Sequence, residues 1–296
     1  MGFTRVESIL FEAGFGDAVI VGFTGGDRAG VTAARALQAI KRESVGYARS
    51  SAPILTPGLA QSKLAKNKLP SFGLMLTPAR GLMVPALAGI RDAFGLTGGF
   101  NVCPRASLGC AAACLSRSGQ SGMPQQQRAQ AVRTAFLLAH PREAGLIIGA
   151  ELRSAVRRHG EINLRLNTTS DIRWEKISPA MMAALTAGGV HLYDYTAWSP
   201  ADREASEIYS LTYSAKEPSH TSDDYLRGIL SGGGTVAMPF TTRRGEDLPA
   251  TWQGFTVIDG DESDERRLDP AGVVVGLRAK GHEWRKDNSA GFIRTA

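Results

Sequence analysis

The sequence has little that would place it in a membrane or in an oxidising compartment. Its 296 residues contain no run of about 18 uncharged apolar residues, and "AVIVGF" after Asp17 is too short to span a bilayer. That stretch also begins too late in the chain for a cleaved signal peptide. Only three cysteines are present, an odd number that does not favour a disulfide framework. We therefore expect a cytoplasmic protein with free thiols.

Acidic residues are scarce in the first half of the chain. Residues 1–142 contain 16 Lys and Arg against 6 Asp and Glu, whereas residues 143–296 contain 18 against 22. Between Glu43 and Glu143 the only acidic residue is Asp92, and eleven basic residues occupy the same stretch. Such a basic half favours nucleic acid or an acidic protein as a partner. A solvated surface without a partner is the simpler alternative.

Nucleotide-binding motifs are absent from the glycine-rich start of the chain. "GFGDAVIVGFTGG" at residues 14–26 lacks the G-x-G-x-x-G spacing, and no Gly-Lys-Ser/Thr follows it. The first seventy residues predict one helix, at residues 30–43, where apolar residues recur on one face. The remainder looks irregular, and "GLAQSKLAKNKLP" has the composition of a linker. We therefore assign residues 1–69 to a basic, Gly-rich N-terminal extension and linker.

From residue 70 onward, short β-rich runs alternate with helical stretches. The predicted strands are "FGLMLT", "INLRLN", "HLYDYT", "IYSLTYS", "TVAMPF", "FTVID" and "VVVGLRA". Helices are predicted at residues 125–139, 143–158, 179–187, 201–207 and 222–231. This alternation is typical of parallel β/α units. The predicted fold of residues 70–296 is therefore an α/β domain built as a parallel β/α barrel or a partial, open barrel.

Polar residues gather where the predicted strands end. These ends are "NTTSD" at 167–171, "DYT" at 194–196, "SAKE" at 214–217, "TTRR" at 241–244 and "DGDESD" at 259–264. In β/α barrels the chemistry lies on loops at the carboxyl ends of the strands. We therefore expect Asn167, Asp171 and Asp194 to bind a cofactor or substrate at this rim. Asp171 could instead cap a following helix.

All three cysteines lie within twelve positions, in "NVCPRASLGCAAACL". Cys110 and Cys114 are expected on one helical face, with Cys103 approaching from the preceding loop. Three soft thiolates with C-x6-C-x3-C spacing favour a [4Fe-4S] cluster with three ligated corners. Zinc is an alternative, although a distant histidine would have to complete its site. Chance thiols in a helix and loop are the second alternative.

The fourth iron of such a cluster has no evident protein ligand nearby. All five histidines lie outside the cysteine segment, and its Ser and Gln side chains are weak iron ligands. We expect an exchangeable or solvent-derived ligand, with His220 or Asp171 as the fallback. A catalytic metal site keeps an open position of this kind, whereas a structural site is closed by protein.

Several motifs, in their order along the chain, resemble a bacteriophage family, gene product 88. They are "FGLMLTPA", "NVCPRASLGCAAACL", "RLNTTSDIRWE", "LYDYT", "LTYSAKE", "VIDGDESDERRLDP" and "VVVGLRAKG". The resemblance covers roughly residues 66–296. It implies a phage origin, and hence the host-cell cytoplasm, together with a shared cysteine site. It assigns no activity.

The cysteine loop after the first predicted strand is also similar to that of radical S-adenosylmethionine enzymes. In those enzymes a partial β/α barrel holds a [4Fe-4S] cluster through three cysteines, usually spaced C-x3-C-x2-C, and the fourth iron binds S-adenosylmethionine. This resemblance implies an iron-sulfur enzyme with radical or Lewis-acid chemistry. The alternative is a non-enzymatic iron-sulfur protein whose basic half engages nucleic acid or an acidic host protein.

Overall fold

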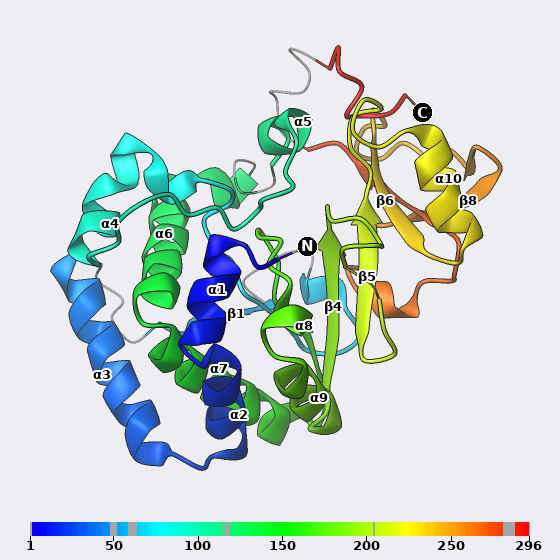
Figure 1. The fold of residues 1–296 in the computed structure, drawn as a ribbon. Helices are drawn as coiled ribbons and strands as arrows, with labels where there is room; N and C mark the ends of the chain where they lie inside the picture. Colours follow the sequence, from blue (N-terminus) through cyan, green and yellow to red (C-terminus); the bar gives the residue numbers. More distant parts are fainter. Residues whose placement is uncertain are drawn as a thin grey trace.

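The computed structural model describes residues 2–47, 52–58, 64–114, 116, 119–203, 205–280 and 288–295. The strands are β1 (Thr56–Pro57), β2 (Ser71–Gly73), β3 (Ile162–Arg165), β4 (Val190–Thr196), β5 (Tyr209–Ser214), β6 (Thr235–Phe240), β7 (Thr251–Trp252), β8 (Phe255–Asp259) and β9 (Val274–Arg278). The α-helices of the described part are α1 (Arg5–Glu12), α2 (Phe15–Thr24), α3 (Arg28–Ser44), α4 (Ala88–Ala93), α5 (Leu108–Ala112), α6 (Pro124–Ala139), α7 (Pro141–His159), α8 (Trp174–Ile177), α9 (Pro179–Ala187) and α10 (Asp223–Ser231). Figure 1 shows how these elements surround one central sheet.

The sheet is mostly parallel, and its strands follow the order β1-β2-β3-β4-β5-β6-β9-β8-β7. Neighbours from β2 through β8 pair in parallel, whereas the edge strands β1 and β7 pair antiparallel to β2 and β8. Strands β2 to β6 stand in chain order and β9 follows them. Within the described ranges no pairing joins β1 to β7, so the sheet is open. The predicted α/β class with parallel strands is confirmed, and a closed barrel is not observed there.

Each of the seven predicted strands overlaps an observed strand. The central ones are buried along most of their length, because parallel strands are covered on both faces. All four residues of β3 are buried, and five of the seven residues of β4 are buried. β2 is shorter than predicted, but Leu74 and Leu76, which follow it in the sequence, are also buried in the core.

Four of the five predicted helices downstream of residue 70 are confirmed as α6, α7, α9 and α10. The helix predicted at residues 201–207 is wrong. The backbone N–H groups of Asp202 and Arg203 both donate to the carbonyl of Ser199 at 2.9 Å, which makes a turn. A bridge between Ser206 and Tyr209 then leads into β5. The turn lets the side chain of Arg203, 1% exposed, enter the protein interior.

The N-terminal region is helical, not irregular as predicted. α3 contains the expected helix, and α1 and α2 precede it. α1 begins with a capping box in which Thr4 and Glu7 satisfy each other's backbone N–H groups. The glycines of α2 were misleading, because Gly22 packs directly against the backbone of α7 near Leu146. Glycine in this segment therefore serves close helix packing and does not mark a loop.

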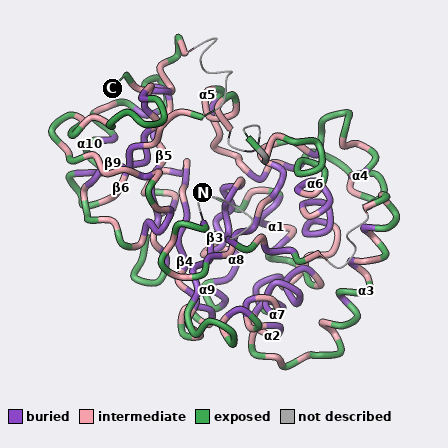
Figure 2. Tube along the Cα trace, turned by 180° about the vertical axis from the view of Figure 1, so that it is seen from behind, coloured by how far each residue is buried: buried purple, intermediate pink, exposed green. Residues whose placement is uncertain are grey.

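The N-terminal helices share one hydrophobic core with the sheet. Val6, Leu10 and Phe15 belong to the same buried cluster as Leu164 of β3 and Leu211 of β5. A second, smaller cluster lies between α10 and strands β6 and β9. Figure 2 shows the buried backbone concentrated in β3, β4, α6 and α7, while much of α3 is exposed. The proposed boundary at residue 69 stays a prediction.

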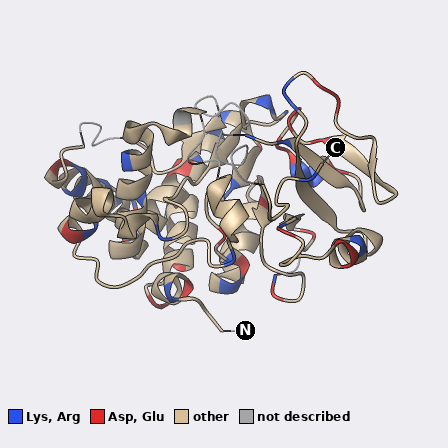
Figure 3. Cartoon of the chain, turned by 90° about the horizontal axis from the view of Figure 1, so that it is seen from above, with Lys and Arg blue, Asp and Glu red and all other residues tan. Residues whose placement is uncertain are grey.

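Charged residues lie mainly on the helices and loops around the sheet, as Figure 3 shows from above. Most of the chain between them carries uncharged side chains, which accords with a sheet covered on both faces. Among the described helices, none is long and apolar enough to cross a membrane.

Candidate functional site: a cysteine cluster at the sheet edge

The cysteine segment lies at the edge of the sheet to which the parallel strands point. Cys103 follows α4 in a loop, and its Sγ is 3.4 Å from the carbonyl oxygen of Thr169, just beyond β3. The N–H of Gly109 in α5 donates to Oε1 of Glu217, just beyond β5, at 2.5 Å. Figure 1 shows α5 above the ends of β4, β5 and β6. The structure therefore places the cysteines at the carboxyl rim, where the sequence predicts them.

The fold brings the three thiols into one neighbourhood. Burial raises the pKa of Cys110 to about 12, and it also raises the pKa of Cys103. Cys114 adds to both shifts, and so does the carboxylate of Asp171, because each lies close enough to repel a thiolate. The thiols of Cys103 and Cys110 are therefore protonated unless a cation is present to stabilise their thiolate forms.

The arrangement within the cysteine segment differs from the predicted one. α5 ends at Ala112 with Ala113 as its C-cap, so Cys114 lies beyond the helix and not on its second turn. Cys114 Sγ is 3.2 Å from Ser116 Oγ. None of the three cysteines forms a disulfide bond. In the part of the chain that the structure describes, no group of three His, Cys, Asp or Glu side chains is arranged to hold a metal ion. The thiols are neighbours, and they do not form a ligand shell.

A buried carboxylate attaches α5 to the sheet. Burial would raise the pKa of Glu217, but hydrogen bonds from Ser107 and from the N–H of Gly109 hold it below its usual value. Ser107 also caps α5, because its Oγ accepts the N–H of Cys110 at 3.2 Å. A Cβ on Gly109 would lie 2.6 Å from both Glu217 Oε1 and the Cβ of Phe292. Only glycine therefore fits between this carboxylate and the C-terminal segment.

Asp171 lies beside the thiols, with its carboxylate occupied by donors from the protein. Oδ1 accepts the hydroxyl of Thr196 at 2.9 Å and Nη1 of Arg203 at 3.0 Å, and Oδ2 accepts the N–H of Ala197 at 2.8 Å. Burial raises the pKa of Asp171, and the positive charge of Arg203 opposes that shift. Asp171 therefore braces the loops after β3 and β4 against each other next to the cysteines.

Asn167 and Asp194 are brought together and bind each other. The backbone and side-chain nitrogens of Asn167 donate to the two oxygens of Asp194 at 2.8 and 3.2 Å. The side-chain oxygen of Asn167 accepts the N–H of Ile172 and the indole N–H of Trp174. The hydroxyl of Tyr209 donates to Asp194 at 2.5 Å, and burial raises the pKa of Asp194 to about 7. Their predicted role in cofactor binding stays a prediction, since the contacts seen here are internal.

Arg203 is the residue of this network that sequence reasoning missed. Its fully buried guanidinium donates to Asp171 and, at 2.6 Å, to the hydroxyl of Tyr209, and its Nε is 3.3 Å from Glu175. Through Tyr209 it links Asp171 to Asp194. The sequence contains no local signal for this, because "ADREAS" has the polar composition of an exposed helix.

A pocket of about 490 Å³ opens beside the cysteine segment. Its lining comes largely from the loops after β4 and β5 and includes Lys216 and His220, the latter a fallback ligand for iron. Lys216 is close enough to Cys110 to oppose the rise of its pKa. The guanidinium of Arg105 lies 4.6 Å from the ring centroid of Trp198, also on the pocket wall. The pocket therefore has basic side chains and an aromatic surface near the cysteine segment, and Asp202 of its lining lies 3.6 Å from Arg105.

These features define a class: an α/β protein with an open, mostly parallel sheet and a cluster of free thiols beside a polar pocket at the carboxyl edge. Comparison with known families is more specific. The chain belongs to the family described as Gene product 88, a phage gene-product family whose sequence model matches residues 55–296. This confirms the resemblance carried by its motifs. Curated proteins and solved structures give no match.

Proposed function

We propose that this protein is an iron-sulfur enzyme that holds a [4Fe-4S] cluster through Cys103, Cys110 and Cys114. The observation that carries the proposal is the proximity of three free thiols to one another at the carboxyl edge of a parallel sheet, near a pocket of about 490 Å³. Thiolates are the usual protein ligands of such clusters, and three of them leave one iron for another ligand. A small molecule entering from the pocket would supply that ligand.

The order of the strands supports the similarity to radical S-adenosylmethionine enzymes. Strands β2 to β6 and β9 stand side by side in chain order, all parallel, and the cysteine segment follows the first of them. A partial β/α barrel with its cysteine loop after the first strand has the same arrangement. The spacing C-x6-C-x3-C differs from the usual one. A direct test of S-adenosylmethionine binding is therefore part of the experiment.

One basic side chain near the thiols, Lys216, would attract a negatively charged group. Lys216 adjoins Cys110 and Asp171, and Arg105 lines the same pocket. Because the thiols of Cys103 and Cys110 are protonated on their own, loading a metal must release protons, and affinity must rise with pH. Once bound, the cluster would supply an electron and one open coordination position. The thiols must turn toward a common point to bind it.

The test is anaerobic reconstitution with ferrous iron and sulfide, followed by metal and labile-sulfide analysis. The intact chain is expected to retain about four irons and four sulfides per molecule. Cys103→Ala, Cys110→Ala and Cys114→Ala should each lower retention strongly. Ser116→Ala is the matched control, because it removes a buried hydroxyl beside Cys114 and leaves every thiol. Zinc without sulfide, or equal iron in control and cysteine variants, would contradict the proposal.

The identity of the small ligand is tested on the reduced cluster. Electron-nuclear double resonance with isotopically labelled S-adenosylmethionine should show coupling to that molecule if the chemistry is of the radical type. Coupling to labelled water alone would indicate Lewis-acid chemistry at the open iron. A strong protein-nitrogen coupling with neither would mean a closed site, and would favour the non-enzymatic alternative.

A further inference from the structure

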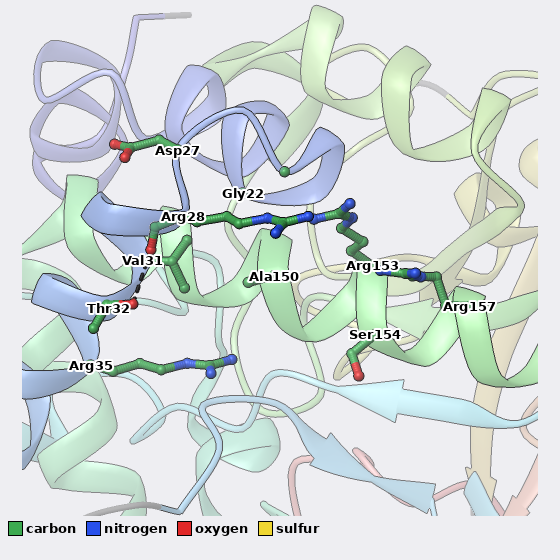
Figure 4. A pocket seen from close by; sticks show the side chains of 11 residues that line it. Gly22, Asp27, Arg28, Val31, Thr32, Arg35, Ala150, Arg153, Ser154 and Arg157 are labelled. Carbon is green, nitrogen blue, oxygen red and sulfur yellow. Dashed lines mark hydrogen bonds between the residues drawn. The ribbon is translucent and has the colours of Figure 1, made fainter.

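A second pocket, of about 590 Å³, lies among α2, α3 and α7, and four arginines line it. Arg28 and Arg35 come from α3, and Arg153 and Arg157 come from α7. Figure 4 shows the side chain of Arg28 crossing the space toward Arg153, with Arg35 reaching in from the same helix as Arg28. Guanidinium groups from two helices therefore converge on one cavity.

The positive charge of this pocket is not neutralised from within. Its lining contains one acidic residue, Asp27, whose Oδ1 accepts the N–H of Gly30 as the N-cap of α3, and Figure 4 shows Asp27 turned away from the guanidinium groups. Glu151 lies near Arg35, but its two oxygens accept backbone N–H groups of another segment. Across the described ranges none of the four arginines forms a salt bridge. Like charges held together without partners favour an anion from outside.

One of these arginines is positioned by the helix that faces it. Gly25 ends α2 with φ 80°, and a Cβ at this position would collide with the guanidinium of Arg153. The guanidinium therefore lies directly against the carboxyl terminus of α2, where the helix dipole attracts positive charge. Arg153 lines the pocket and has no hydrogen bond to another described residue.

The chemistry of the lining selects the kind of anion. Guanidinium groups bind phosphate oxygens through paired N–H donors, and four of them exceed what one phosphate requires. The remaining walls are small or aliphatic, among them Gly22, Val31 and Ala150. No aromatic side chain is among the lining residues, so the pocket offers no surface on which a base could stack. We propose that this pocket binds consecutive phosphates of a nucleic-acid backbone without reading the base sequence.

This inference goes beyond the proposed function and does not depend on it. Figures 1 and 2 both show α3 far along the molecule from α5, which carries Cys110. None of the four arginines lies in the cysteine segment or in the pocket beside it. Cluster-free protein should therefore bind nucleic acid as well as loaded protein does, and failure of one proposal leaves the other intact.

The experiment is fluorescence anisotropy of a labelled 20-base-pair DNA duplex titrated with the full chain over a series of salt concentrations. If four phosphates are neutralised, the logarithm of the binding constant should fall with the logarithm of salt concentration with a slope of about −3.6. Arg28→Ala/Arg157→Ala should reduce the slope to about −1.8 and weaken binding at least about tenfold at low salt. Both side chains are exposed and unpaired, so the variant should keep the melting temperature of the wild type.

Arg158→Ala/Arg243→Ala is the matched control, because it removes the same charge from exposed arginines outside the pocket. Equal weakening in both double variants, or no binding by the wild type, would overturn the proposal. Inorganic tripolyphosphate and polyglutamate are tested as competitors. Competition by tripolyphosphate supports a site for consecutive phosphates, and tripolyphosphate binding without duplex binding would assign it to free polyphosphates. Binding of polyglutamate in preference to the duplex would overturn it in favour of an acidic protein.

Discussion

Replacing Glu217 by alanine should release α5, and with it Cys110, from the end of β5. The carboxylate is 2% exposed, accepts the N–H of Gly109 at 2.5 Å and is hydrogen-bonded to Ser107. A hydrogen bond to a charged group contributes about 1.5–3 kcal/mol net, so losing the Gly109 bond alone should raise the open population of α5 about 10- to 150-fold. The effect should be local, because α5 has only five residues and none of them is fully buried.

Hydrogen–deuterium exchange of the peptide that contains α5 measures this opening directly. Glu217→Ala should accelerate exchange in that peptide and leave the peptides of β3 and β4 unchanged. Glu207→Ala is the control, since Glu207 is exposed and lies before β5 in the same part of the chain. Unchanged protection of α5 in Glu217→Ala, or equal loss in the control, would refute the assignment of Glu217 as the group that holds the cysteine helix.

The same contact predicts a pH dependence with a definite sign. The folded-state pKa of Glu217 lies below its usual value of 4.5, so the ionised carboxylate is the form that the fold stabilises. Its contribution is therefore fully present above about pH 4.5 and is lost as the pH falls through the lower folded-state pKa. After correction for intrinsic exchange rates, wild-type protection of α5 should approach that of Glu217→Gln under acid conditions. If the difference in α5 protection between the wild type and Glu217→Gln is as large at pH 2.5 as at neutral pH, the result would contradict this sign.

Four further substitutions test the packing of the fold. Gly22→Ala and Gly149→Ala should each destabilise the protein by about 1–3 kcal/mol, because a Cβ would strike the facing backbone of α7 or α2, respectively. Gly228→Ala, on the open face of α10, should instead stabilise it by about 0.5–1 kcal/mol. Thermal melts of the three variants test this difference in sign. Glu7→Gln should lower the free energy of unfolding, measured in urea, by about 3–5 kcal/mol, because it leaves the buried guanidinium of Arg173 without its charge partner at 2.6 Å. A loss below about 1 kcal/mol would show that the fold does not depend on this pair.

Local pattern was enough to predict most of the sheet and the longer helices. The strands are short β-rich runs that alternate with helical stretches, and α7 and α9 have their own start signals in Pro141 and in Ser178 followed by Pro179. Local pattern failed where a residue's surroundings decided its conformation. The glycines of α2 resembled a loop because their close contact with α7 comes from residues more than a hundred positions away. The turn at residues 199–203 was missed because it accompanies the burial of the Arg203 side chain, which depends on the tertiary structure.

The sequence by itself determined that any soft-ligand site must be in residues 103–114, since no other cysteine exists, and that polar residues would gather at the strand ends. Only the tertiary structure decided which groups surround those thiols. Gly109 and Glu217 are 108 residues apart in sequence and in contact in space. The basic pocket likewise takes Arg153 and Arg157 from the half of the chain with a net negative charge, and none of its arginines from between Glu43 and Glu143. Charge and burial depend on distances through space, and chain order specifies those only within one helix or strand.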